Sequence, residues 1–222
     1  IEKSNASFVG TMYYEWPKQI DMTGYWNKRN VKEGVYKVTK KDTPEQVDSW
    51  IRFFHVGTTI VKTEIARKYG GFYDQNKCCT GEDTIFFTKL VFNERFAITG
   101  PPAVRHNRQD SGLSITHSHP ITPVLTESEI LLKYCPEDKI DLCKDFLAIF
   151  ALRTANHKAR NGFKNEAKYL LRKHPRAKKQ GLTYYKCRLE ILFSRWMPYW
   201  VALKVKTGPS IRLCIKKISY KC

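Results

Sequence analysis

The sequence predicts an α/β domain followed by a basic, mostly helical extension. In the first part, aromatic and β-branched segments typical of strands are mixed with segments of helical spacing. In the last part, the apolar spacing is helical almost throughout. Charge is also unevenly placed: residues 1–150 carry 20 Lys and Arg against 19 Asp and Glu, whereas residues 151–222 carry 19 against 2. We therefore expect a domain over residues 1–124 and an extension over residues 125–222.

Four segments of the first part are expected to be strands because they are apolar, aromatic or β-branched. They are residues 6–14, 50–61, 96–98 and 103–105. Gly57 interrupts the second segment, and the pair Pro101-Pro102 separates the last two. The polar residues 17–49 are predicted to form loops and edge strands.

The helices are placed by their start and stop signals. Thr63 is expected to cap a short helix that Gly70 ends, and a second helix is expected from Glu82 to about Asn93. Thr126 and Glu129 have the spacing of a capping box. In the extension, helices are expected over residues 136–161, 163–174, 182–196 and 201–206.

The segment Gly81-Glu82-Asp83 is the strongest candidate for chemistry. Two adjacent carboxylates at the start of a helix lie beside the positive end of its dipole, which favours their ionised form. An ionised carboxylate at the mouth of a cleft is a candidate general base. The alternative is structural, namely that Glu82 and Asp83 cap the helix.

Four sequence pieces in the surrounding stretch follow one another as in a known enzyme family. They are Gly57-Thr58-Thr59-Ile60-Val61; Glu64 to Asp74 with Gly70-Gly71-Phe72; Gly81-Glu82-Asp83-Thr84 with Phe87 and Leu90; and Ala97-Ile98 with Pro101, Arg105, Ser111 and Ser114. This stretch resembles the acceptor-side half of family 2 glycosyltransferases, which have the GT-A fold. Ala6 to Glu15 resembles the strand that follows the metal-binding motif of the family. The whole first part is then a partial GT-A domain.

The resemblance implies an inverting transferase of the hexosyltransferase type. Asp83 would be the general base that takes the proton from an acceptor hydroxyl. Glu82, Gly81, Gly57 and Thr58 would line the acceptor site. The donor would be a nucleotide sugar and the acceptor a saccharide or a lipid-linked saccharide, in the synthesis of a surface polysaccharide or glycolipid.

The donor side of the family pattern is missing. No Asp-x-Asp motif occurs in the chain, so the resemblance places the main ligands of the expected Mn²⁺ or Mg²⁺ outside it. We expect the chain by itself not to turn over a sugar nucleotide. Arg105 is the candidate for the donor diphosphate, because a guanidinium binds phosphate in bidentate fashion; a surface ion pair with Asp110 is the alternative. His106 is the candidate metal ligand, with an ordinary surface histidine as the alternative.

The extension interleaves cations with Trp and Tyr, which favour the interface between membrane and water. No stretch approaches the roughly 18 apolar residues that span a bilayer. We therefore expect a cytoplasmic protein in peripheral contact with the inner face of an anionic membrane. A basic face packed on the domain is one alternative; nucleic-acid binding is disfavoured because no recognition motif accompanies the charge. The rival for the whole chain is a non-catalytic basic module that binds anionic membrane or an acidic polymer.

The cysteines and two of the tryptophans complete the candidates. The seven cysteines include no Cys-x-x-Cys pair, so a zinc ribbon is unexpected and reduced thiols are predicted. Trp16 and Trp26 lie in loop-like surroundings and are candidates for stacking on a sugar ring.

Overall fold

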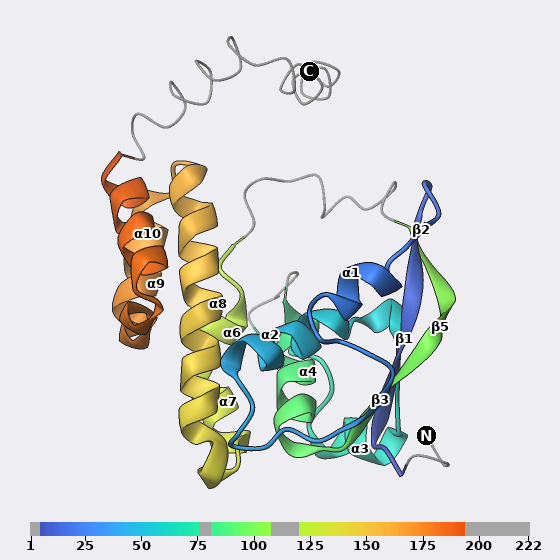
Figure 1. Cartoon of the computed structure of the whole chain (residues 1–222). Coiled ribbons are helices and arrows are strands. Elements are labelled where there is room, and N and C mark those ends of the chain that lie inside the picture. Colours follow the sequence, from blue (N-terminus) through green and yellow to red (C-terminus); the bar gives the residue numbers. More distant parts are fainter. Residues whose placement is uncertain (1–4, 76–80, 108–119, 194–222) are drawn as a thin grey trace. The chain divides into compact units, whose positions relative to one another are not determined.

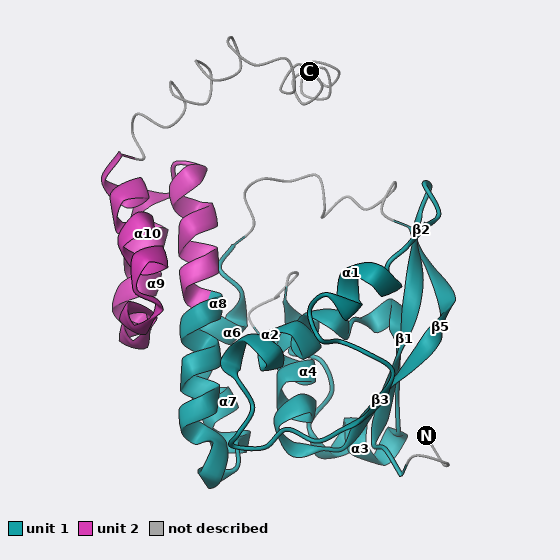
Figure 2. Cartoon of the chain, viewed as in Figure 1, with its two compact units in different colours: residues 1–150 teal, residues 151–222 magenta. Residues whose placement is uncertain are grey.

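The computed structural model describes residues 5–75, 81–107 and 120–193. The chain forms two compact units, residues 1–150 and residues 151–222 (Figure 2). The first unit is mixed α/β with a curled sheet, which confirms the predicted class. The sequence-based boundary is residue 124, whereas the compact units divide at residue 150.

The sheet of unit 1 has five strands: β1 (Phe8–Trp16), β2 (Ile20–Asp21), β3 (Gly34–Tyr36), β4 (Thr59–Val61) and β5 (Phe96–Asn107). β1 and β5 are parallel neighbours, as Figure 1 shows. β3 continues the sheet beyond β5, and β2 and β4 both pair with the other edge of β1. The parallel pair is therefore the centre of the sheet.

Besides the sheet, unit 1 contains the helices that lie before residue 150 in the sequence. They are α1 (Thr23–Asn27), α2 (Pro44–Phe53), η2 (Val56–Thr58), α3 (Thr63–Lys68), α4 (Glu82–Asn93), α6 (Pro123–Thr126), α7 (Ser128–Tyr134), η4 (Glu137–Lys139) and the first half of α8 (Ile140–Arg160). α2 and α4 pack against each other. The predicted helix from Glu82 to Asn93 is confirmed residue for residue.

An aromatic core joins α2 and α4 to the sheet. Phe96, at the start of β5, is fully buried. Its ring centroid lies 5.4 Å from Phe8, 5.3 Å from Phe54 and 5.4 Å from Trp50. Gly10 of β1 makes room for this cluster, because a Cβ there would come within 2.7 Å of the Phe54 ring. This core therefore packs α2 against the two central strands of the sheet.

The predicted strand over residues 50–61 is wrong except for its last three residues, Thr59–Val61, which form β4; residues 56–58 form η2. Residues 50–53 are the last turn of α2, whose start is capped by the Thr43 hydroxyl accepting from Gln46 N at 3.2 Å. Pro44 at the first helical position supports this start. The aromatic residues of the segment lie on the buried face of a helix. Their composition, which is typical of a strand, therefore predicted the wrong secondary structure.

The predicted break at Pro101-Pro102 does not end the strand. β5 runs through both prolines, and its register against β1 shifts between Thr11 and Tyr13 at this point. β3 pairs only with Phe96–Ile98, so beyond them β1 is the only strand among the described residues that pairs with β5. The missing N–H groups of the prolines therefore fall at an irregularity, which is where a sheet tolerates them.

Two predicted caps are also wrong. Thr63 is the first residue of α3, which begins without a side-chain cap at Lys62. Thr126 is the last residue of α6, and the residue before α7 is Glu127, so Thr126 is not the N-cap residue of α7. Gly70, with φ of 76°, follows α3 closely, as predicted.

Unit 2 is helical, with the second half of α8, α9 (Lys164–Lys173), η5 (Pro175–Gln180) and α10 (Leu182–Phe193). Small and apolar side chains such as Ala167, Leu170 and Cys187 are fully buried within it. Gly162, with φ of 85°, lies between α8 and α9 as predicted. The expected helix over 201–206 and the end of the one over 182–196 lie outside the described residues.

None of the helices that the structure describes is long and apolar enough to cross a membrane. Among the described cysteines, Cys135, Cys143 and Cys187 are free thiols; Cys78, Cys79, Cys214 and Cys222 lie outside the described residues.

Candidate acceptor-side site

Gly81 sets the start of α4 and thereby the position of both carboxylates. It adopts φ of 81° and ψ of 13°, the left-handed region that glycine reaches most easily. A Cβ at this position would come within 2.8 Å of the Thr122 side chain. The backbone N–H of Tyr73 donates to the Glu82 carbonyl at 3.4 Å. The Gly-Gly-Phe loop and Thr122 thus both lie against the first turn of α4.

The pKa of Asp83 is shifted in the opposite direction from the predicted one. Its carboxylate accepts a bond from the Thr84 hydroxyl at 3.2 Å. Burial nevertheless raises the pKa of Asp83 above its ordinary value, with a smaller contribution in the same direction from Glu82. The stabilising effect expected of the helix dipole is therefore outweighed by desolvation. A carboxylate with a raised pKa is a stronger base than an ordinary one, provided that it is ionised at the working pH.

Two buried polar atoms close to Asp83 lack a hydrogen-bond partner within the described ranges. They are Glu82 Oε2 and Thr122 Oγ1. Most buried polar atoms in proteins are hydrogen-bonded, so each exception calls for an explanation, such as a bound group. Glu82 Oε2 in the first turn of α4 and Thr122 Oγ1 beside Gly81 are therefore free to bond a polar ligand.

The Gly-Gly-Phe loop lines a cavity of about 310 Å³ in unit 1. Lys89 and Tyr134 contribute to its other side, with the Lys89 ammonium 4.3 Å from the centroid of the Tyr134 ring. Asp83 and Glu82 are not among the residues that line this cavity. The carboxylate of Asp74 lines this cavity instead, so the predicted role of Asp83 stays a prediction.

His106 lies in a small cluster with His55 and Tyr13. The ring centroids of His55 and His106 are 4.8 Å apart, and that of Tyr13 is 5.1 Å from His55 and 5.6 Å from His106. The predicted acceptor residues Gly57 and Thr58 belong to η2, next to His55: the Thr58 hydroxyl donates to the His55 carbonyl at 3.4 Å. The structure thus brings together two of the predicted site segments, η2 and the end of β5.

Arg105 and His106 cannot serve one site on one face of β5. Successive residues of a strand point to opposite faces. Arg105 is exposed, and its guanidinium lies 5.8 Å from the centroid of the Trp16 ring. Trp26, the other sugar-stacking candidate, is only 4 % exposed and packs on Phe53, so that hypothesis is wrong for Trp26. Asp110, the alternative partner of Arg105, lies outside the described residues.

The described residues do not fit the divalent metal that the resemblance implies. Within ranges 5–75, 81–107 and 120–193, no group of three or more His, Cys, Asp or Glu side chains is placed to hold a metal ion. His106 has a second imidazole beside it, but this pair alone does not make such a group. No step of the proposed reaction is therefore assigned to a metal.

Three residues of these clusters were not predicted from the sequence. His55 and Tyr13 meet His106 only because β1 and β5 pair in parallel and η2 lies against them. Thr122 meets Gly81 across a gap of forty residues in the sequence. No local pattern marks such contacts, whereas Asp83 is marked by its motif.

Comparisons with protein-family models, with curated proteins and with solved structures gave no match to this chain. The structure itself defines the fold class of the chain, which is a mixed α/β unit followed by a helical, basic unit.

Gly81→Ala is expected to destabilise unit 1 more than Gly70→Ala does. Both glycines have positive φ, which costs an L-residue about 1–2 kcal/mol. Only at Gly81 would the new methyl group also clash, with Thr122, and such overpacking adds typically about 1–3 kcal/mol; nothing lies within 4 Å of a Cβ at Gly70. Urea unfolding of the two variants measures the difference, and equal losses would contradict the contact between Gly81 and Thr122.

Proposed function

We propose that this chain is the acceptor-side part of an inverting glycosyltransferase with a GT-A arrangement. The observation that carries the proposal is the first turn of α4. There, a half-buried carboxylate with a raised pKa, Asp83, adjoins Glu82, whose Oε2 is buried and has no partner in the described part of the chain. The order of the four sequence pieces supports the same assignment.

In the proposed reaction, an acceptor hydroxyl attacks the anomeric carbon of a nucleotide sugar. The new C–O bond forms as the bond from the anomeric carbon to the diphosphate oxygen breaks, and the nucleoside diphosphate leaves with that electron pair. Asp83 takes the hydroxyl proton. Glu82 and Thr122 hold the acceptor by hydrogen bonds, and one displacement inverts the configuration of the sugar.

The substrates proposed are a nucleotide-sugar donor and a saccharide or lipid-linked acceptor. Arg105, exposed at the end of β5, is the proposed contact for the donor diphosphate. We also propose that the protein works at the cytoplasmic face of an anionic membrane, because residues 151–222 carry 19 cations against 2 acids.

Release of nucleoside diphosphate from a panel of nucleotide sugars tests this function. The protein is assayed as its source makes it, with and without saccharide and lipid-linked acceptors. We expect release from at least one donor that depends on the acceptor. No release from any donor, or release that no acceptor increases, would contradict the proposal.

A further inference from the structure

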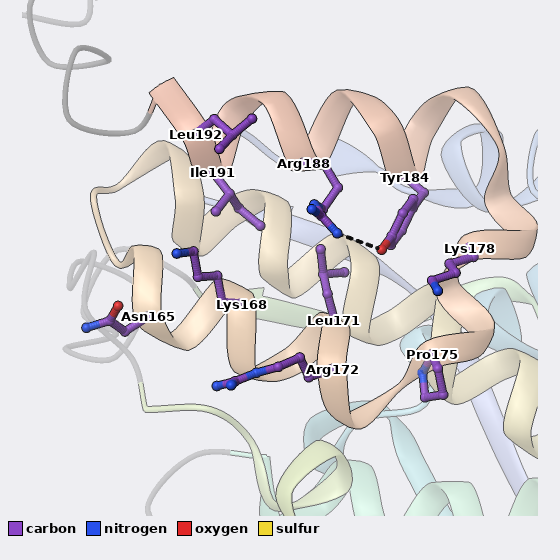
Figure 3. A pocket seen from close by; sticks show the side chains of 10 residues that line it. All are labelled: Asn165, Lys168, Leu171, Arg172, Pro175, Lys178, Tyr184, Arg188, Ile191 and Leu192. Atoms are coloured by element: carbon purple, nitrogen blue, oxygen red, sulfur yellow. Dashed lines mark hydrogen bonds between the residues drawn. The ribbon is translucent and has the colours of Figure 1, made fainter.

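Unit 2 contains a cavity of about 730 Å³ between α9, η5 and α10 (Figure 3). Its floor is apolar, because Leu171, Tyr184 and Ile191 line it and are all nearly buried. Four exposed cations stand around this floor: Lys168, Arg172, Lys178 and Arg188. A ligand that fits this lining has both an apolar part and a negative charge.

The cations of the cavity are not neutralised by carboxylates of the same unit. Unit 2 has two acidic residues in its sequence. Glu166 pairs with Lys158 at 2.6 Å, and Glu190 pairs with Arg160 at 2.9 Å. Within the described residues, Lys168, Arg172 and Lys178 have no ion pair. Their positive charge is therefore available to an anion.

Arg188 is held in position at the centre of the cavity. Its Nη1 donates to the Tyr184 hydroxyl oxygen at 3.3 Å, one helical turn away on α10 (Figure 3). This bond occupies one of the five N–H groups of the guanidinium. The others remain for a phosphate, which a guanidinium binds in bidentate fashion.

An exposed apolar stripe on α10 borders the cavity. Leu182, Tyr185, Leu189 and Leu192 are 88 %, 65 %, 54 % and 57 % exposed, respectively, and Phe193 is 57 % exposed. Their spacing of three or four residues, with one adjacent pair, places them on one face of the helix. Leu192 also lines the cavity, so the stripe and the basic rim are continuous. A cluster of large apolar side chains bordered by cations is the pattern of a helix that lies in a membrane interface.

We propose that unit 2 docks on a bilayer of anionic phospholipid, with the α10 stripe in the acyl boundary and one lipid phosphate in the α9–α10 cavity. Lys168, Arg172, Lys178 and Arg188 surround the phosphate, and Leu171 and Ile191 contact the adjoining glycerol and acyl carbons. Charge complementarity selects this occupant over an uncharged partner. The proposal deepens the membrane contact proposed above but does not depend on the chemistry of Asp83.

Co-sedimentation with vesicles tests the proposal on the whole chain. The vesicles are phosphatidylcholine alone or phosphatidylcholine with phosphatidylserine, and we expect binding only to the second kind. Lys168→Gln/Lys178→Gln is compared with Lys173→Gln/Lys179→Gln, which removes the same charge from residues that do not line the cavity. The cavity pair should lower the partition coefficient about 30-fold, because both ammonium groups contact the bound phosphate and a Lys that close to the anionic charge contributes about 1 kcal/mol, whereas Lys173 and Lys179 do not reach it. The control pair should lower it far less.

Several outcomes would overturn the proposal. Equal losses in the two double variants would mean diffuse attraction without a site in the cavity. Tighter binding to random-sequence RNA than to anionic vesicles would identify a nucleic acid as the partner. A dimer in light scattering that Leu189→Ser abolishes would assign the stripe to a second copy. Because the assay uses no sugar donor, its result is independent of the transferase assay.

Discussion

Asp83→Asn is expected to lower the rate of sugar transfer by about 100-fold or more, the typical contribution of a general base. The amide keeps the size of the side chain and its contact with Thr84 but cannot accept the hydroxyl proton. Asp138→Asn is the matched control, because Asp138 is an exposed carboxylate of unit 1 in η4, outside the four sequence pieces. The rates are measured as acceptor-dependent release of nucleoside diphosphate. A transfer rate unchanged in Asp83→Asn would refute the assignment of the base.

The same substitution is expected to stabilise the fold at neutral pH. Burial raises the pKa of Asp83 in the folded protein, so the folded state binds the proton more tightly than the unfolded chain does. Above the folded pKa the ionised group costs stability, and this cost disappears as the pH falls below the unfolded value of about 3.9. Thermal unfolding should therefore show a higher Tm for Asp83→Asn at neutral pH and no gain in acid. If the charge of Asp83 instead stabilises the helix through its dipole, the substitution lowers the Tm.

Phe96→Ala is expected to destabilise unit 1 by about 3–5 kcal/mol, the usual cost of deleting a buried phenyl ring. Phe96 is fully buried, and its ring also stacks on Tyr36 with centroids 5.6 Å apart. Whole domains are stable by only about 5–15 kcal/mol, so the variant should be close to unfolding. Urea unfolding followed by tryptophan fluorescence measures the effect.

Phe72→Ala is the control for this prediction, because Phe72 is 45 % exposed and its ring lies 5.1 Å from Phe86 and 6.4 Å from Phe87. We expect it to cost much less than Phe96→Ala. Comparable losses in the two variants would mean that Phe96 is not at the centre of the core.

The helices were predicted better than the strands, because the signals that define a helix lie within its own segment of the sequence. α4 begins after Gly81 and α9 follows Gly162, so glycine signals and apolar spacing define them in the sequence. α2 was missed although Thr43 and Pro44 mark its start, because the aromatic residues that follow resemble a strand in composition. The continuity of β5 through two prolines depends on its pairing with β1, which lies far away in the sequence.

The candidate site was predicted only in part, because several of its features depend on contacts between residues that lie far apart in the sequence. The motif identifies Glu82 and Asp83, but the direction of the pKa shift of Asp83 depends on tertiary burial. The cluster of His106 with His55 and Tyr13 depends on the pairing of β1 with β5 and on the position of η2. Arg105 was predicted to contact the donor diphosphate and His106 to bind a metal, and their places as successive residues of a strand direct them to opposite faces.

The central claim is that one carboxylate, Asp83, acts as a base in a single displacement. The configuration of the new glycosidic bond tests this most directly, and ¹H NMR of the anomeric proton in the product measures it. The account predicts the opposite configuration to that of the nucleotide sugar. Retention would contradict it, because retention requires a second nucleophile and two displacements.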